Sequence, residues 1–545
     1  MQLFGISQYG KSKDVTAQNR LNAYMEVQPG DDKTRVAFYG TPSLDLLTSF
    51  GDTPIRGLYQ KGDFYYVVHR GTFYEVNNAS VKTVKGTINS TSGKVSMSDN
   101  GVQLMLTDGA DGWIYNLNNP TPKTISSITH VGDVATVTTE EAHNMLSGSE
   151  VTHSGATESA YNGTFRIDAT GIYTYTYTML TTPSGDATVV GVYANSQFAK
   201  IVDEDYQPLS TVTWQDGYFI GNANLTGFKK RFIVSSIANG FLWDALEFAS
   251  AESNPDDITV VETDNSNLYL FGEVSTEFWT NTGNVDFPFD RISGGAIEWG
   301  CAAVNSVVKF DNSLAFLAKN RMGEVIIARM QGYAPQRISN PELEYFINGY
   351  LDVADASFYS YMLGGHPMLQ CNFPSAGKSW LYDGLSNAWS QLKSDGIARH
   401  RGEMAVNYIN KTVVADYENG NIYRLNPDGY ADNGAPIEFE LISRHISQDN
   451  KRLIVDSVEL EMEYGVGLAT GQGETPQIMM QISKDGGHTF GNERWVGFGK
   501  VGQYKYRAIW RRCGQSRDFV FKFRITDPVK RVITNAIIQT RLGTS

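Results

Sequence analysis

The stretch Gly62-Asp63-Phe64-Tyr65-Tyr66-Val67-Val68, followed by Gly71-Thr72-Phe73-Tyr74-Glu75-Val76, decides the fold. It contains two short strands rich in aromatic residues, each opened by a turn residue. Aromatic and β-branched residues favour strands, whereas Gly and Asp favour tight turns. Such a unit has one apolar face that it cannot bury alone, so it must stack against further copies of itself.

Further copies of this unit recur along the chain. They are 109–115, 214–220, 264–272, 311–317, 377–384 and 416–425. A degenerate repeat of ~40–50 residues built from strands is typical of a β-propeller. We therefore predict an all-β chain built on a β-propeller of six or seven blades, for which scaffold or binding work is the default and catalysis needs separate evidence.

The bulk composition is that of a folded acidic protein. Of 545 residues, 41% are hydrophobic and 12% aromatic, which is enough for a substantial core. The net charge of -14 and the pI near 5.1 argue against a protein that grips nucleic-acid phosphates broadly. An acidic wall repels the DNA backbone, so the same charge suits a conduit past which DNA slides.

The cysteines and the chain start suggest folding in a reducing cytoplasm. Cys301, Cys371 and Cys513 are far apart, and no CxxC pair exists, so neither a zinc site nor a disulfide framework is expected. Met1 to Gly10 shows no apolar segment of a secretory signal, and no apolar run approaches ~18 residues.

Breaks in the repeat pattern divide the chain into five segments. They are an N-terminal arm (1–48), the first blades (49–122), an inserted Ig-like β-sandwich module (123–195), the remaining blades (196–435) and a platform-like C-terminal β-sandwich (436–545). The arm is expected to be irregular, to turn at 28–32 and to be tied to the body by Leu21, Tyr24 and Tyr39.

Local sequence patterns predict the strands of the insert and of the C-terminal domain, and one helix. Alternation of Thr with Tyr or Val marks 134–138 and 173–178 as strands, and regular alternation at 456–464 and 519–525 indicates strands with one wet face. A short helix is predicted over 340–350, with Asn340 as N-cap and Pro341 in its first turn.

One turn motif resembles an Asp-box, the structural turn of sialidase-type propellers. Its residues are Ser483, Asp485, Gly487, Thr489 and Phe490. We expect these side chains to tie down a hairpin beside an aromatic anchor, far from any chemistry. A glycosidase would need two carboxylates at a defined separation, and nothing among the 59 acidic residues picks out such a pair.

Basic residues concentrate near the C-terminus. The candidates for an oligomer or adaptor contact are Arg507, Arg511, Arg512 and Arg517, with Trp510 as an aromatic anchor beside them, and Lys522 and Arg524 follow. The alternative is a solvated strand face with acidic partners in the same chain. His400, between Arg399 and Arg401, indicates a basic cluster that pairs with neighbouring acids rather than a metal site, because the chain has no HExxH or HxH spacing.

Long ordered motifs resemble the packaged-DNA stabilisation proteins, or tail hubs, of short-tailed bacteriophages. They lie at 22–26, 40–44, 243–256, 268–283, 287–291, 300–303, 311–314, 332–339, 485–490 and 510–521. The resemblance spans nearly the whole chain except 123–195, which is similar to a small β module grafted into phage tail proteins. For that insert, nozzle extension, fibre docking and surface decoration all stay open.

The resemblance implies a structural virion protein without enzyme activity or cofactor. It implies a sixfold ring below the portal and adaptor, which retains packaged double-stranded DNA, extends the ejection channel and docks fibres, spikes or a needle at the host surface. Such a protein would be made in the host bacterial cytoplasm and end in the virion tail. The rival hypotheses are a propeller glycosidase or depolymerase of host polysaccharide, and a glycan-binding tail protein without turnover.

Overall fold

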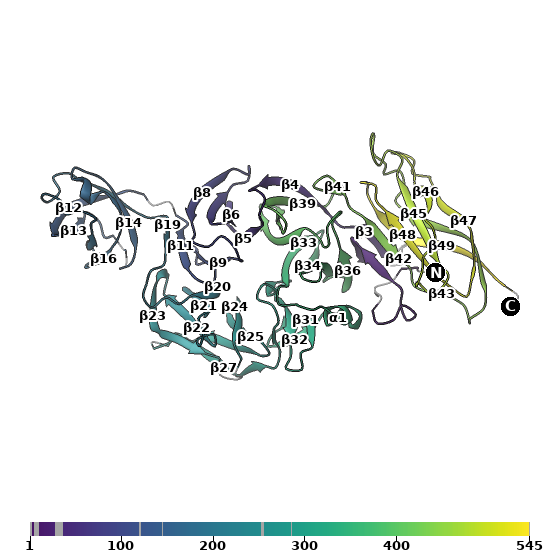
Figure 1. Ribbon diagram of the computed structural model, residues 1–545, viewed down its shortest axis with the longest axis horizontal. Coiled ribbons are helices and arrows are strands. Elements are labelled where there is room, and N and C mark those ends of the chain that lie inside the picture. The colour runs from purple at the N-terminus through teal and green to yellow at the C-terminus, as the bar shows by residue number, and fades with distance from the viewer. Residues whose placement is uncertain are drawn as a thin grey trace. The chain divides into compact units, whose positions relative to one another are not determined.

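The computed structural model is almost entirely β-structure (Figure 1). It describes residues 3–4, 10–27, 36–118, 121–143, 145, 147–251, 256–284 and 286–543. The chain divides into two compact units, one made of Met1–Ile55 and Trp299–Ser545 and the other of Arg56–Glu298. The prediction of an all-β chain is confirmed.

The unit Arg56–Glu298 contains four antiparallel sheets of four strands each. The first is β5 (Ile55–Lys61), β6 (Phe64–His69), β7 (Thr72–Val76) and β8 (Lys82–Thr87); the second is β9 (Ser96–Asp99), β10 (Gln103–Thr107), β11 (Gly112–Asn116) and β19 (Phe198–Lys200); the third is β20 (Leu209–Gln215), β21 (Tyr218–Ala223), β22 (Arg231–Ser236) and β23 (Asn239–Ser250); the fourth is β24 (Ile258–Asp264), β25 (Asn267–Gly272), β26 (Thr276–Asn281) and β27 (Phe289–Ile297).

The turn residues of the repeat explain how these strands pair. In the third sheet, Gln215 pairs with Tyr218 across Asp216 and Gly217, which both have positive φ, 51° and 96°. A two-residue loop with two positive φ angles matches the twist of an antiparallel hairpin, and Asp-Gly adopts it readily. The aromatic strands then bury their rings between sheets; Phe73, for example, is fully buried and stacks on Phe198.

A separate sheet structure interrupts the second of these sheets. The chain leaves after β11, forms seven strands, and returns as β19 to pair with β11. These strands are β12 (Lys123–Val131), β13 (Val134–Thr139), β14 (Glu150–Ala156), β15 (Gly163–Arg166), β16 (Asp168–Ala169), β17 (Thr174–Thr178) and β18 (Val190–Asn195), with a 3-10 turn, η1 (Ser159–Tyr161). They enclose a core of their own, with Tyr175 and Tyr177 from β17 among its buried rings.

Three more sheets of the repeat lie in the other unit, with one helix. Their strands are β28 (Gly300–Cys301), β29 (Val308–Lys309), β30 (Leu314–Lys319), β31 (Val325–Gln331) and β32 (Ala334–Arg337); β33 (Ser357–Leu363), β34 (His366–Phe373), β35 (Lys378–Asp383) and β36 (Ala388–Leu392); and β37 (Gly402–Tyr408), β38 (Lys411–Asp416) and β39 (Asn421–Asn426), completed by β4 (Ser43–Ser49). The helix α1 (Pro341–Ile347) begins where predicted, because the Asn340 side chain accepts a hydrogen bond from the Leu343 N–H.

The C-terminal region of the same unit is a sandwich of two sheets around one core. One sheet has the order β2 (Ala23–Val27), β3 (Val36–Gly40), β49 (Val532–Leu542), β44 (Leu453–Met462) and β47 (Ala508–Ser516). The other joins β42 (Phe439–Ile442), β48 (Asp518–Ile525), β45 (Gln477–Ser483) and β46 (Arg494–Gly497), with β43 (Ile446–Ser447) pairing β48; the short pair β40 (Ala431–Asp432) and β41 (Ala435–Pro436) precedes them. Both inner faces are apolar, with Val458, Trp510 and Phe521 buried between them.

The N-terminal segment corrects the sequence analysis. The segment 1–48 is extended, but the prediction that it is irregular is wrong, because its described residues form β1 (Asn19–Leu21), β2, β3 and β4 in three different sheets. Its alternation looked poor because Asn22 has a φ of 51°, which ends one strand and turns the chain into the next. The turn predicted at 28–32 lies outside the described residues.

The segment fastens the sandwich to the sheet of β33–β36. Strand β1 pairs with β36 on one side and β42 on the other, so one sheet runs through both. The Asn22 side chain donates to the carbonyl oxygens of Lys393 and Glu438, each at 2.8 Å, and accepts from the Lys393 N–H. Strand β4 closes the last repeat sheet by pairing with β39.

Candidate functional site

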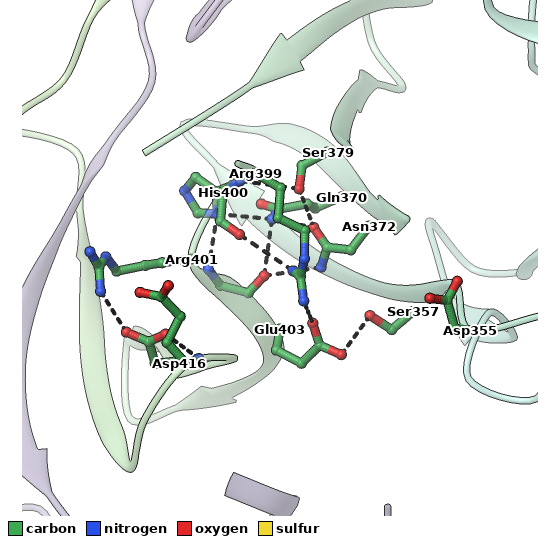
Figure 2. Close-up of polar contacts among 12 residues, drawn as sticks. Asp355, Ser357, Gln370, Asn372, Ser379, Arg399, His400, Arg401, Glu403 and Asp416 are labelled. Atoms are coloured by element: carbon green, nitrogen blue, oxygen red, sulfur yellow. Dashed lines mark hydrogen bonds and ion pairs between the residues drawn. The ribbon is translucent and has the colours of Figure 1, made fainter. Parts of the chain in front are cut away.

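The basic cluster at 399–403 leads into strand β37; Arg399, His400 and Glu403 are buried, and Figure 2 shows the polar contacts of the cluster, including that of His400 with Gln370 of β34. The Arg399 guanidinium donates to the Glu403 carboxylate at 2.7 Å and lies over the ring of Tyr417, 3.7 Å from its centroid. The other Glu403 oxygen accepts from the Ser357 hydroxyl at 2.9 Å. Arg401 points toward Asp416 instead and donates to it at 2.7 Å.

His400 is held neutral inside this cluster. Its Nδ1 accepts hydrogen bonds from the Gln370 amide at 2.9 Å and from the Gly402 N–H at 3.1 Å. Burial, with the charges of Arg399 and Arg401, lowers the pKa of His400 to about 3. The cluster therefore pairs with acids of its own chain, and its surroundings leave no open position for a ligand.

Asp432 is a second buried group with a shifted pKa. Asp432 accepts from the Leu44 N–H at 3.1 Å and from the Ser394 hydroxyl at 3.0 Å, and burial raises its pKa to about 6. Its exposed fraction is 3%, so no substrate could reach it. Its contacts with Leu44 and Ser394 indicate a structural role, because they join β4 to the loop after β36.

A hollow of about 300 Å³ lies at the base of the insert in the Arg56–Glu298 unit. Gln103, Asn116, Asn195 and Lys123 line it among other residues, and no carboxylate does. Glycoside hydrolysis needs two acidic groups across the scissile bond, which this hollow does not supply. Within the described ranges there is also no group of three or more His, Cys, Asp or Glu side chains arranged to hold a metal ion.

The Asp-box-like turn is built around one carboxylate. Asp485 accepts from the Ser483 hydroxyl at 2.6 Å, from the Thr489 N–H at 2.9 Å and from the Thr489 hydroxyl, and the Gly487 N–H donates to Ser483 Oγ at 2.8 Å. These bonds hold the pKa of Asp485 well below its usual range. The Phe490 ring lies beneath the Lys522 ammonium, 4.6 Å away, so the turn packs on the sheet rather than facing a cavity.

The C-terminal arginines lie along β47, the last strand of its sheet. Residues opposite one another show which side chains share the outer face: Glu459 pairs with Ile509, and Ser457 pairs with Arg511. We call this outer face and free edge the arginine face, made of Arg507, Ile509, Arg511, Arg512 and Arg517. All its arginines are exposed.

Within this face the arginines differ in their partners. Arg507 forms a two-pronged ion pair with Glu459, at 2.7 and 2.6 Å. Arg511 lies within electrostatic reach of the same Glu459, and the charges of Arg507 and Arg511 both lower the pKa of that carboxylate. Among the described residues, Arg512 and Arg517 form no ion pair. Arg512 has a φ of 57° and bulges from the strand, where the register shifts opposite Asp456.

Trp510 does not reach the arginine face. It is 2% exposed, belongs to the sandwich core and donates its indole N–H to the Arg494 carbonyl at 2.7 Å. Its predicted role as an exposed anchor is wrong, because strand alternation turns it to the face opposite Arg511. Sequence reasoning missed Ile537, which pairs with Glu459 from the other side and is 44% exposed; an apolar residue at an outward position was its signal.

The fold is a set of repeat sheets with a β-sandwich. The sites described above either stabilise the fold or offer a surface for contact. Two family models fit this class: "Bacteriophage P22 Gp10, beta-propeller" matches residues 166–430, and "Bacteriophage P22 Gp10, beta-sandwich" matches residues 438–541. The chain belongs to the bacteriophage P22 Gp10 family of packaged-DNA stabilisation proteins. It is a structural protein of the phage tail, and the predicted propeller and C-terminal sandwich are confirmed.

Other comparisons add little. A search of curated proteins found no match. Among solved structures, the designed Ika8 protein is 8% identical with a TM-score of 0.33, covering 70% of this chain and 99% of that one. The WD40 propeller of Doa1 is 9% identical with a TM-score of 0.32, covering 71% and 96%. We build nothing on likenesses at this level. None of the helices in the described segments has the length and apolar character to cross a bilayer.

Proposed function

We propose that this protein is the hub, or nozzle, of a short phage tail. It would form a ring below the portal and its adaptor, retain packaged double-stranded DNA and extend the channel for ejection. The observation that carries the proposal is the match of both the repeat sheets and the sandwich to the two domains of bacteriophage P22 Gp10. A tail protein of this family assembles with other virion proteins.

A closed ring, which we propose to hold six copies, fits the charges of the chain. The net charge of -14 would repel the DNA backbone from the lumen, so DNA would pass without sequence-specific binding. Contacts around such a ring join two different surfaces of neighbouring copies. The arginine face is the candidate for one of them, or for the adaptor.

The remaining parts of the proposal concern blades and distal partners. The propeller would have six or seven blades. The insert of β12–β18 would serve the outer surface, where fibres, spikes or a needle dock and the host cell is met. Synthesis and folding would take place in the host cytoplasm.

The mass of the assembled species tests this function. We expect native mass spectrometry or negative-stain imaging to show rings of about six chains, and images of tails to show the ring next to the adaptor. Tails that place the protein as a lone monomer away from the channel would refute the proposal. Release of sugars from host polysaccharide by the purified protein would instead favour the glycosidase.

A further inference from the structure

Two exposed surfaces of the chain carry an excess of one charge. The first is the arginine face, where Arg507 and Arg511 share the carboxylate of Glu459, and Arg512 and Arg517 form no ion pair among the described residues. The second lies in the Arg56–Glu298 unit, and we call it the acidic edge: Glu204, Asp205, Asp244, Leu246 and Glu247. No lysine or arginine in the described part pairs with its four carboxylates.

The acidic edge is formed by a bulge and a turn held together. In β23, Trp243 pairs with Ser235 and Phe248 with Ile233, so residues 244–247 bulge out of the ladder. The turn at 203–206 lies against this bulge, because the Trp243 N–H donates to the Asp203 carboxylate at 3.2 Å. Leu246, at the top of the bulge, is 80% exposed.

The negative charges on the acidic edge repel one another. Burial of part of the side chain, with the nearby charge of Asp244, raises the pKa of Glu247. One Glu247 oxygen is out of contact with water and has no hydrogen-bond partner. A cation bound beside Asp244 and Glu247 would counter the nearby negative charge that raises the pKa of Glu247, and would offer the Glu247 carboxylate a partner.

The edge also faces away from the neighbouring sheet. Strands β20 and β24 touch through the hydroxyls of Thr213 and Thr263, 2.9 Å apart, which places β23 at the opposite margin of its sheet. The next sheet repeats the design, since β27 bulges at 292–295 between Arg291 and Ala296. Bulges at strand edges prevent the addition of another strand, so side chains must make any contact here.

The arginine face has the same design with the opposite charge. Strand β47 is also the last strand of its sheet and is also bulged, at Arg512, and the outer face of that sheet presents apolar Ile509 and Ile537 on either side of Glu459. Arginine is enriched among the residues that carry most of the binding energy of interfaces. Both surfaces therefore place exposed apolar side chains beside an excess of charge, and the two charges are complementary.

We propose that the arginine face of one copy binds the acidic edge of the next copy. Leu246 would pack against Ile509 and Ile537, while Arg511 and Arg512 would pair with Asp244 and Glu247. The contact joins two different surfaces, so it repeats from copy to copy, which is the kind of contact that builds a ring when the rotation between copies closes. This inference rests on the proposed ring function and names the surfaces that build it.

A charge-swap experiment tests the contact. Variant A carries Arg511→Glu and Arg512→Glu, and variant B carries Glu204→Lys and Asp244→Lys. Each variant alone presents like charges at the contact, so its mass should fall to that of a single chain, 60.3 kDa. In an equimolar mixture, every contact between A and B is again complementary, so rings with alternating copies should return.

The control is Lys309→Glu with Lys393→Glu, which changes the net charge as variant A does at exposed lysines outside both surfaces. This control should assemble like the unchanged protein. Circular dichroism checks that every variant is folded. Rings formed by A or B alone, or a mixture that stays monomeric, overturn the inference.

The outcomes separate this inference from the proposed function. If the unchanged protein forms rings and both variants do too, the contact is wrong while the hub function stands. If the unchanged protein and the mixture are both monomeric at high protein concentration, self-association through these surfaces is refuted. The hub function is then judged on imaged tails alone.

Discussion

The cluster at 399–403 and the arginine face contain the same residue type in opposite circumstances. In the cluster, Arg399 and Arg401 each end on a carboxylate of the same chain, within sheets that exclude water. On the arginine face, Arg512 forms no ion pair among the described residues, and Arg511 only lies near Glu459, whose carboxylate is already paired with Arg507. Buried charges with partners hold the fold together, whereas exposed charges without partners are available to another molecule.

The sequence around each arginine pair explains the difference. Ala398-Arg399-His400-Arg401-Gly402-Glu403 supplies its own acid four residues after Arg399, and Asp416 faces Gly402 across β37 and β38. Trp510-Arg511-Arg512-Cys513 has apolar residues on both sides, which turn inward and leave the arginines outside. The following predictions test that contrast, in order of expected effect.

The largest effect is expected from Arg399→Met. The change leaves the Glu403 carboxylate buried without its cation, which costs about 3–5 kcal/mol of unfolding free energy. Urea denaturation measures the loss, and faster amide exchange in β34 and β37 locates it. The double variant Arg399→Met with Glu403→Leu should recover most of the loss, and a double variant as unstable as the single one would contradict this account.

Acid should weaken the same cluster through His400. Its folded pKa of about 3 lies below the ordinary value of 6.5, so the unfolded chain binds the proton more readily between these values. Stability at His400 is therefore full above pH 6.5 and is lost as pH falls toward 3, at about 1.4 kcal/mol per pH unit.

The test compares His400→Asn with the unchanged protein between pH 7 and pH 4. Asparagine keeps an acceptor near the position of Nδ1 but does not titrate, so the variant should lose less stability on acidification. His130→Asn, in the insert, is the matched control for the substitution itself. Equal acid sensitivity of the His400 variant and the unchanged protein would exclude this role.

A smaller effect is expected at the Asp-box-like turn. Asp485→Ala removes the acceptor for the Ser483 hydroxyl and for two groups of Thr489, which should cost about 1–2 kcal/mol in unfolding free energy. Asp485→Asn keeps one acceptor oxygen and should cost less. If alanine and asparagine are equally harmless in urea denaturation, these bonds do not stabilise the turn.

These tests also show which parts of the structure the sequence could predict. Local patterns sufficed for the repeat strands, for the cap at Asn340 and for the pairing of the 399–401 cluster with acids, because each signal lies within a few residues. They failed for 1–48, since β1, β3 and β4 find partners hundreds of residues away: Arg20 pairs with Leu441, Phe38 with Ile533, and Leu44 with Leu425. They failed for Trp510 because its charged neighbours suggested an exposed position, whereas strand alternation turns this side chain inward.

The smallest stability effect is expected at the arginine face itself. Arg511→Ala and Arg512→Ala remove exposed side chains that form no ion pair of their own in the described structure, so the free energy of unfolding should change by no more than about 0.5 kcal/mol. Assembly should nevertheless weaken, most strongly at low salt, where charge pairing across a contact is least screened. Urea denaturation and native mass spectrometry measure the two quantities on the same samples. Arg399→Met supplies the reverse pattern, because it lowers stability and leaves the arginine face intact. If the alanine variants unfold as easily as Arg399→Met, the arginine face belongs to the fold, and the contrast between the two regions is lost.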